Sequence, residues 1–276
     1  MWKDRMIFFD CEVFKYDWLF VFEDINETYY CFHNDYEGIS KFIEEHKDSI
    51  LCGYNNKFYD NYILKGILLG KPVNEIKEIN DAIIGGVQGW EIPNLSYVDI
   101  PTTTDLMSDV PMGLSLKEIE GNLGMNIKES EVDFNIDRPL SKEEFEETLA
   151  YCKHDVNATK ILFDIRFDYV NSKVEVGKLG GLECDEIIGL TNAKLTAKFL
   201  KAIPQEWNDS NDYVIPDNVD LNKIPKEVIE FFNKMKYVDE TQADTSSKLK
   251  IDIASVPHTV GMGGLHGAIP NYKEGE

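Results

Sequence analysis

Two patterns are missing from this sequence, and each absence excludes a class of protein. No apolar run approaches the ~20 residues of a membrane span, and the first five residues, M-W-K-D-R, lack the apolar stretch of a signal peptide. We therefore expect a cytoplasmic protein with no membrane partner. Cysteine pairs of the C-x-x-C type are also missing, which predicts free thiols in a reducing compartment and no disulfide framework or zinc site. The cysteines are Cys11, Cys31, Cys52, Cys152 and Cys184.

Basic residues are few. The chain has 28 lysines and arginines against 50 aspartates and glutamates, which gives a formal net charge of −22. A surface of this sign argues against a simple nucleic-acid binder, whose affinity rests on basic residues. It does not exclude an enzyme that approaches a phosphodiester through bound metal ions, because the ions then supply the positive charge.

The composition that remains is that of a globular protein. With 276 residues, of which 43% are hydrophobic, the chain can form one large domain or two small ones. Its first ~170 residues alternate strand-like and helix-like segments, which predicts an α/β fold with a mixed sheet flanked by helices. The expected strands span residues 6–14, 18–23, 28–33, 49–54 and 95–100, and the expected helices span 36–47, 59–69, 74–84, 114–123 and a long segment from Ser141.

The pattern changes after residue 170. The sequence there predicts helices over 186–203 and 225–236, loops over 205–222 and 239–247, and a glycine-rich end at 261–267. The sequence also predicts that Asp252 is an acidic residue in a loop. We therefore expect a first domain at 1–175 and a mainly helical extension at 176–276.

The first expected strand carries two acids. Residues 6–14 read M-I-F-F-D-C-E-V-F, so Asp10 and Glu12 project from the same face of a hydrophobic strand. Neighbouring carboxylates at the end of a core strand repel each other and lose hydration, unless a cation lies between them. The pair therefore indicates a divalent metal site such as one for Mg²⁺, or else a strand end with two solvated acids.

Two further acids occur where such a site needs them. Asp60 lies in the first turn of a helix that follows a strand, where it can face the cleft at the strand ends; it can equally be an acid favoured by the helix dipole. Tyr151 and Asp155 lie four residues apart in the long helix and so share one face. The same spacing also occurs in pairs that only lie on a helix surface.

Together the four acids predict a two-metal site. Two ions ~3.5–4 Å apart, bridged by carboxylates, are a standard arrangement for phosphodiester hydrolysis. We expect two Mg²⁺ or Mn²⁺ ions, with Asp10 bridging both and Asp155 holding the ion that carries the attacking water. Glu12 and Asp60 would complete the ligands, and Tyr151 would orient the water or help to deprotonate it.

Three motifs in order, D-C-E, Y-N-x-x-x-Y-D and Y-x-x-x-D, resemble those of the proofreading 3′→5′ exonucleases of the four-acid, tyrosine-type class. The resemblance covers roughly residues 5 to 170 and implies an RNase H-like fold. The sister class has a histidine five residues before the last acid, but this chain has Ala150 there. His154 is therefore not the catalytic histidine. The matching residues are Asp10, Glu12, Asn55, Tyr59, Asp60, Tyr151 and Asp155.

A second resemblance concerns the C-terminal part. The stretches L-T-N-A-K-L-T-A-K-F-L at 190–200 and G-M-G-G-L-H-G-A at 261–268 are similar to the region leading into the polymerase domain of bacteriophage-type family A DNA polymerases. The chain ends eight residues after Ala268, so the resemblance implies a polymerase domain or subunit that is not on this chain. If a phage encodes this protein, we expect it in the cytoplasm of the bacterial host cell.

These resemblances imply a metal-dependent exonuclease that trims single-stranded DNA 3′ ends as part of a truncated or split DNA polymerase. Asn55, Phe58 and Tyr59 would then contact the terminal nucleotides, and Lys57 a phosphate, unless Lys57 is simply solvated. Two alternatives stay open: an RNA-trimming exonuclease of the same fold, and a non-catalytic module that binds DNA ends in a polymerase complex.

Overall fold

The computed structural model describes residues 2–110, 114–203, 220–235, 248–253, 255–261 and 264–267. Contacts divide the chain into two compact units, Met1–Ala202 and Ile203–Glu276, which are described separately. The boundary expected after residue 175 instead falls inside a helix that ends at Leu179. Among the described residues, no helix is long and apolar enough to cross a bilayer.

The first unit is built on a five-stranded sheet in the order β3-β2-β1-β4-β5. Strand β1 pairs antiparallel with β2 and parallel with β4, so the sheet is mixed, as predicted. A parallel β4–β5 pair and an antiparallel β2–β3 pair complete it. The strands are β1 (Met6–Val13), β2 (Trp18–Asp24), β3 (Tyr29–His33), β4 (Ile50–Gly53) and β5 (Thr102–Asp105).

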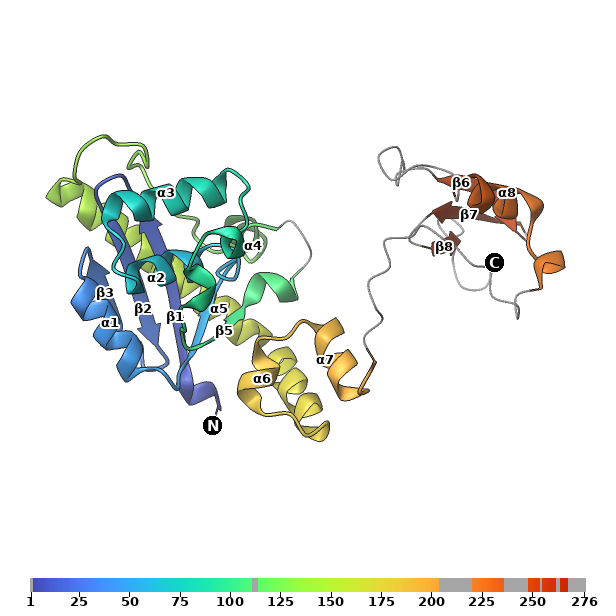
Figure 1. The fold of residues 1–276 in the computed structure, drawn as a ribbon, viewed down its shortest axis with the longest axis horizontal. Coiled ribbons are helices and arrows are strands. Elements are labelled where there is room, and N and C mark those ends of the chain that lie inside the picture. The colour runs from blue at the N-terminus through green and yellow to red at the C-terminus, as the bar shows by residue number, and fades with distance from the viewer. Residues whose placement is uncertain are drawn as a thin grey trace. The chain divides into compact units, whose positions relative to one another are not determined.

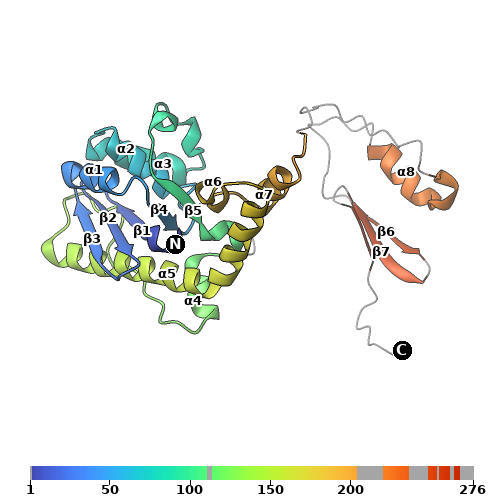
Figure 2. The same ribbon diagram turned by 90° about the horizontal axis from the view of Figure 1, so that it is seen from below.

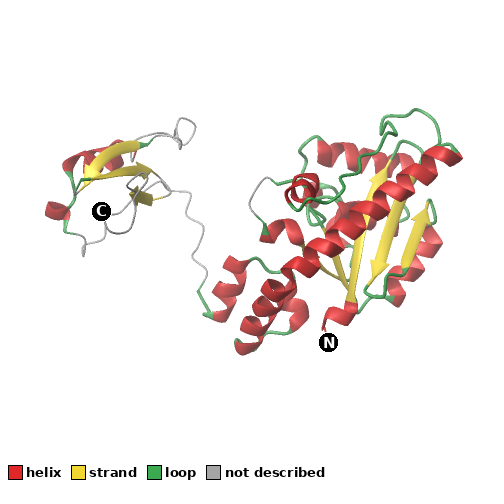
Figure 3. Ribbon diagram, turned by 180° about the vertical axis from the view of Figure 1, so that it is seen from behind, coloured by secondary structure: helices red, strands yellow, loops and turns green. Residues whose placement is uncertain are grey.

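Helices cover both faces of this sheet (Figures 1 and 2). Helices α1 (Tyr36–Glu45), α2 (Asp60–Leu68) and α3 (Val73–Ile84) contribute to the core on one face. The long helix α5 (Lys142–Leu179) runs across the other face, where Figure 3 shows it in front of the strands. This mixed α/β arrangement is consistent with the RNase H-like fold and confirms the expected fold class. Helix α4 spans Leu116–Asn122.

The alternation of β1 side chains separates two hydrophobic cores. Phe8 packs on the α5 side, where its ring centroid lies 5.3 Å from that of Phe163. Phe9 belongs to the core on the other face and stacks on Phe22 at 5.8 Å. Because side chains alternate along a strand, the even-numbered Asp10 and Glu12 follow Phe8 onto the α5 side.

Two predicted helix starts are confirmed by their caps. The Ser141 hydroxyl accepts a hydrogen bond from the Glu144 amide, and the Glu144 carboxylate accepts one from the Ser141 amide. Ser115 and Glu118 form the same reciprocal pair at the start of α4. Each box pairs helix-end amides that would otherwise have no partner inside the helix.

Two sequence-based elements differ in the structure. The strand expected at 95–100 is wrong: Leu95–Tyr97 forms a 3₁₀ turn after Asn94, whose φ is +70°. The strand instead follows Pro101, because β-branched threonines suit a strand and proline is tolerated just before one. The single helix expected at 186–203 is two helices, α6 (Cys184–Ile188) and α7 (Asn192–Phe199), because Gly189 ends the first and Thr191 caps the second.

The second unit contains helix α8 and a three-stranded antiparallel sheet. The helix is confirmed, but Asp252 is not a loop acid, because it lies in β6 opposite Pro257. The described part of the expected extension therefore also contains a sheet, in which Gly261 of β7 pairs with Gly264 of β8. The loop expected at 239–247 and most of that at 205–222 lie outside the described residues. The elements are α8 (Lys226–Met235), β6 (Leu249–Ile253), β7 (Val256–Gly261) and β8 (Gly264–Gly267).

Candidate metal centre

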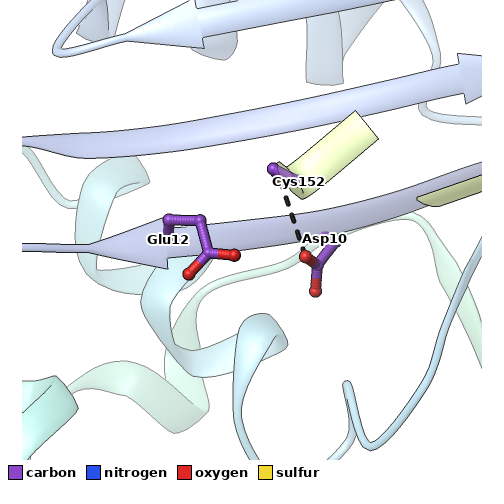
Figure 4. A group of neighbouring side chains, drawn as sticks. All are labelled: Asp10, Glu12 and Cys152. Atoms are coloured by element: carbon purple, nitrogen blue, oxygen red, sulfur yellow. Dashed lines mark hydrogen bonds between the residues drawn. The ribbon is translucent and has the colours of Figure 1, made fainter. Parts of the chain in front are cut away.

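The acid pair of β1 faces helix α5. Figure 4 shows Asp10 and Glu12 on the strand, with Cys152 of α5 beside them. The Cys152 thiol donates a hydrogen bond of 3.5 Å to the Asp10 carboxylate. The ligand atoms of these three residues lie within 4.8 Å of one another, close enough to hold one metal ion.

Asp60 approaches β1 from the opposite layer. It is the first residue of α2 and is buried, and its carboxylate accepts a hydrogen bond of 3.1 Å from the Cys11 thiol. Cys11 belongs to the core under α2 and α3, the face away from Asp10 and Glu12. The fourth acid, Asp155, is a buried residue of α5.

A lysine that the sequence analysis did not single out meets Asp155. The Lys117 ammonium, from α4, forms an ion pair with the Asp155 carboxylate. It also lies 3.5 Å from the carboxylate of Glu120 and 4.8 Å from the ring centroid of Tyr151. Glu120 is buried and faces His154 at 2.9 Å. Glu120, His154 and Asp155 form a second group whose ligand atoms lie within 4.8 Å of one another.

The four acids share one electrostatic environment. Burial, followed by the charges of the other three acids, raises the pKa of Asp10 well above its usual range. Burial and then the charges of Asp155 and Asp60 do the same to the pKa of Glu12. Burial raises the pKa of Asp60 to about 7 and also raises that of Asp155. The Lys117 ammonium opposes this effect at Glu12 and Asp155.

This set of donors fits a hard divalent cation. Mg²⁺ and Mn²⁺ prefer carboxylate oxygens, and an added cation would favour the charged forms that burial and mutual repulsion now disfavour. The Cys152 thiol does not suit the role of ligand, because burial raises its pKa and keeps it protonated. Of the four predicted ligands, Asp10 and Glu12 have their ligand atoms in one group. Asp60 is bonded to the Cys11 thiol and Asp155 to the Lys117 ammonium, and both stay predicted ligands.

The loop before α2 is held by an acid at the end of β5. Asn55 adopts a left-handed φ of +64°, which asparagine tolerates better than most residues. Buried Asp105 accepts hydrogen bonds from the amides of Asn55 at 2.9 Å, Lys57 at 3.2 Å and Met107 at 2.9 Å. This carboxylate fixes the turn that leads to Asp60.

The four expected substrate residues lie on this loop but have different surroundings. Phe58 is exposed, with 52% of its surface accessible. The Tyr59 hydroxyl donates a hydrogen bond of 2.5 Å to Asn80, so its polar end contacts α3. The Lys57 ammonium donates to the Gly189 carbonyl at 2.7 Å, and Asn55 is half-buried.

Sequence reasoning missed Lys117, Glu120 and Asp105. A signal did exist for the first two, because K-E-I-E places Lys117 and Glu120 on one face of a short capped helix. Nothing in that pattern tells which distant acid they meet. Asp105 ends β5, a strand that the sequence analysis places at 95–100, so the sequence pattern did not bring Asp105 to the site.

Comparison with known proteins adds one similar structure. No protein-family model and no curated protein sequence matches the chain. Among solved structures, the chain is similar to the family B DNA polymerase from the hyperthermophilic archaeon Pyrobaculum calidifontis, with a TM-score of 0.46 and 14% sequence identity. The match covers 71% of this chain and 28% of that polymerase, so it spans little more than a quarter of the polymerase's length.

Proposed function

We propose that the unit spanning Met1–Ala202 is a metal-dependent 3′→5′ exonuclease that hydrolyses phosphodiesters at single-stranded DNA ends. The observation that carries this proposal is the electrostatic coupling of four carboxylates from three distant segments. Asp10 and Glu12 come from β1, Asp60 from α2 and Asp155 from α5. Such mutual repulsion costs stability, so its presence at one site is typical of a function that uses it.

The acids would hold two Mg²⁺ or Mn²⁺ ions. The chemistry supplied by such ions is a lowered pKa for the attacking water and compensation for the charge on the leaving oxygen. The protein's part is to hold the ligands in place. Hydrogen bonds from Cys152 to Asp10 and from Cys11 to Asp60 orient two of the carboxylates.

Tyr151 would position the attacking water. Burial, followed by the charge of Asp155, raises the pKa of its phenol above the ordinary value, so the hydroxyl keeps its proton at neutral pH. A protonated hydroxyl can donate one hydrogen bond and accept another. We therefore assign Tyr151 the role of orienting the attacking water.

The wider context of the proposal is DNA replication. The motif order and the stretches at 190–200 and 261–268 support a proofreading unit of a polymerase, which we assign to the bacteriophage-type family A. The partner would be a polymerase domain or subunit, and the substrate a single-stranded 3′ end. Exposed Phe58, on the loop that leads to Asp60, supports a single strand because unpaired bases stack on aromatic rings.

A labelled-oligonucleotide assay tests this function. A single-stranded DNA carrying a 5′ label should shorten stepwise from its 3′ end in Mg²⁺ or Mn²⁺ and stay intact in EDTA. A matched RNA strand, degraded faster than the DNA, would favour the RNA-trimming alternative. If neither strand is cut and calorimetry detects no divalent-ion binding, the chain is a non-catalytic module.

A further inference from the structure

Next to the loop that carries Asp60, two large aromatic side chains stand half exposed. Phe58 and Trp90 each have 52% of their surface accessible. Their ring centroids are 6.5 Å apart and their planes meet at 61°, so the two rings form an open corner. Phe58 lies two residues before Asp60, in the loop that leads to this candidate ligand at the start of α2.

A defined turn places Trp90 there. The residue lies in the 3₁₀ turn Gly89–Glu91, where the Glu91 carboxylate accepts a hydrogen bond of 3.1 Å from the Gln88 amide. Gly89 packs so closely on the Tyr62 ring of α2 that any Cβ at this position would overlap the ring. The turn is therefore seated on α2, the helix that begins with Asp60, and it still leaves the indole half in water.

Leaving the apolar surface of two aromatic rings in contact with water is unfavourable for folding. A Trp or Phe side chain has 150–250 Å² of surface to bury, as a rule of thumb, and single exposed aromatics are common on protein surfaces. Two adjacent ones, of which one lies in the loop leading to a candidate metal ligand, are more typical of a binding surface. Half of that surface is available to a ligand with flat apolar faces.

Charge indicates what kind of contact a nucleic acid could make here. The chain's net charge is −22, so phosphates gain little attraction from its surface as a whole. Bases, in contrast, stack on aromatic rings without regard to sequence, and each stacked base contributes to affinity independently of the phosphate charge. A single strand could therefore bind to this surface through its bases and to the metal centre through its 3′-terminal phosphodiester.

We propose that Phe58 and Trp90 form a stacking platform for unpaired bases of the strand whose 3′ end enters the metal centre. This inference rests on the proposed function for the direction of the strand, but base stacking can be measured separately from cleavage. It adds Trp90, a residue outside the three motifs, to the substrate contacts. It also predicts that the strand is held mainly by stacking of its bases on aromatic rings, and less by contacts between its phosphates and basic side chains.

Binding measured in EDTA isolates the platform from catalysis. The probe is a labelled oligothymidylate, compared with an abasic strand of the same length and charge, with fluorescence anisotropy as the readout. Wild-type protein should bind the oligothymidylate more tightly than the abasic strand. Trp90→Ala or Phe58→Ala should weaken oligothymidylate binding by ~5-fold or more, the effect of losing one stacked base, and should leave abasic-strand binding unchanged.

Two further variants make the comparison specific. Trp90→Phe keeps an aromatic face and should retain most of the affinity for oligothymidylate. Phe199→Ala removes an exposed aromatic ring from α7 and should have no effect. Thermal unfolding of each variant shows whether it is folded. Because Trp90 and Phe58 are half exposed, we expect both alanine variants to fold. If only one of them folds, its binding alone decides the test.

The outcomes separate this inference from the proposed function. Equal binding of the two strands by wild-type protein, or unchanged binding by both alanine variants, overturns the platform even if the protein cleaves DNA. Base-dependent binding that falls in Trp90→Ala, in a protein that cleaves nothing, supports the platform and overturns the nuclease. If neither strand binds, the corner does not accept nucleic acid and the inference is wrong.

Discussion

The ammonium group of Lys117 pairs with the carboxylate of Asp155, a residue 38 positions further along the chain. The same ammonium lies 3.5 Å from the buried carboxylate of Glu120. It lowers the pKa of Asp155 and of Glu12, against the effect of burial. A side chain of the protein thus compensates part of the negative charge that a divalent ion would neutralise.

Removing this cation should make the site harder to ionise. In Lys117→Met the pKa of Asp155 should rise further, because only the hydrogen bond from Tyr151 then opposes burial and the charge of Glu120. Calorimetric titration with Mn²⁺ at several pH values should show half-maximal affinity at a higher pH than in wild type. The matched control is Lys153→Met, on α5, whose ammonium lies over the ring of Tyr29 at 5.2 Å. An unshifted pH midpoint in Lys117→Met would exclude this role.

The pKa of Asp60 gives a prediction for stability against pH. Unfolded, this carboxyl titrates near pH ~4; folded and metal-free, its pKa is raised to about 7 by burial. Between these values the folded state holds a proton that the unfolded state has lost. The contribution to stability is therefore complete below pH ~4 and is lost as the pH rises through the folded pKa.

A divalent ion should reverse that trend, because metal ligands must be deprotonated. The increase in Tm caused by Mn²⁺ should therefore be larger near pH ~8 than near pH ~5. Differential scanning fluorimetry with and without Mn²⁺ measures both effects. Asp60→Asn should flatten the pH dependence of the metal-free Tm, and a curve as steep as that of wild type would assign the dependence to other groups.

The Asp105 carboxylate should determine how well the loop before α2 is placed. Asp105→Asn removes the charge that three backbone amides share, at a cost of ~1–3 kcal/mol in the free energy of unfolding. It should also reduce cleavage, because Asp60 follows this loop. Asp24→Asn is the control: its carboxylate accepts from two amides, of Asn26 and Thr28, in the turn between β2 and β3. Equal cleavage by both variants would show that Asp105 acts on stability alone.

Tyr151→Phe should be milder than the loss of an acid. If the hydroxyl only orients water, its removal should slow excision by no more than ~10²–10⁴-fold. Tyr169→Phe, on the same helix, should cleave normally; its hydroxyl accepts a hydrogen bond from Asn192. Excision rates at saturating Mg²⁺ give the comparison. Wild-type activity in Tyr151→Phe would make the tyrosine structural, and activity as low as in an acid variant would make its role larger than water orientation.

Local patterns were enough to predict most of the first unit. These patterns involve residues that are close in the sequence, so they can be recognised without the structure. They are the alternation in β1, the capping boxes at Ser115 and Ser141, and the helical spacing after each box. The strand near residue 100 was misplaced because its position depends on pairing with β4, a non-local contact. Likewise the break in the helix expected at 186–203 depends on one glycine and one threonine cap, which hydrophobic spacing does not reveal.

The sequence predicts the four acids as ligands, but it does not reveal the other charged groups that surround them in the structure. The motif order led to Asp10, Glu12, Asp60 and Asp155, which the structure brings into one electrostatic environment. The pairing of Lys117 with Asp155 joins two helices and has no trace in either segment alone. The sequence predicts free thiols at Cys11 and Cys152, but their hydrogen bonds to Asp60 and Asp10 depend on the packing of α2 and α5 around β1.

The central claim is that the repulsion among these acids is retained for metal-dependent cleavage, and Asp10→Asn tests it directly. This variant keeps the shape of the side chain and an acceptor for the Cys152 thiol, but removes one of the mutually repelling charges. Asp164→Asn, which affects an exposed ion pair with Lys3, is the matched control.

The decisive measurement pairs excision from a 5′-labelled single-stranded DNA with the free energy of unfolding in EDTA near pH ~8, where the acids of the metal-free protein are ionised at the greatest cost. Asp10→Asn should excise nothing in Mg²⁺ and yet be more stable than wild type without metal, because one of the mutually repelling buried charges is gone. Asp164→Asn should match wild type in both respects. Near-normal excision by Asp10→Asn, or a loss of stability without metal, would contradict the account.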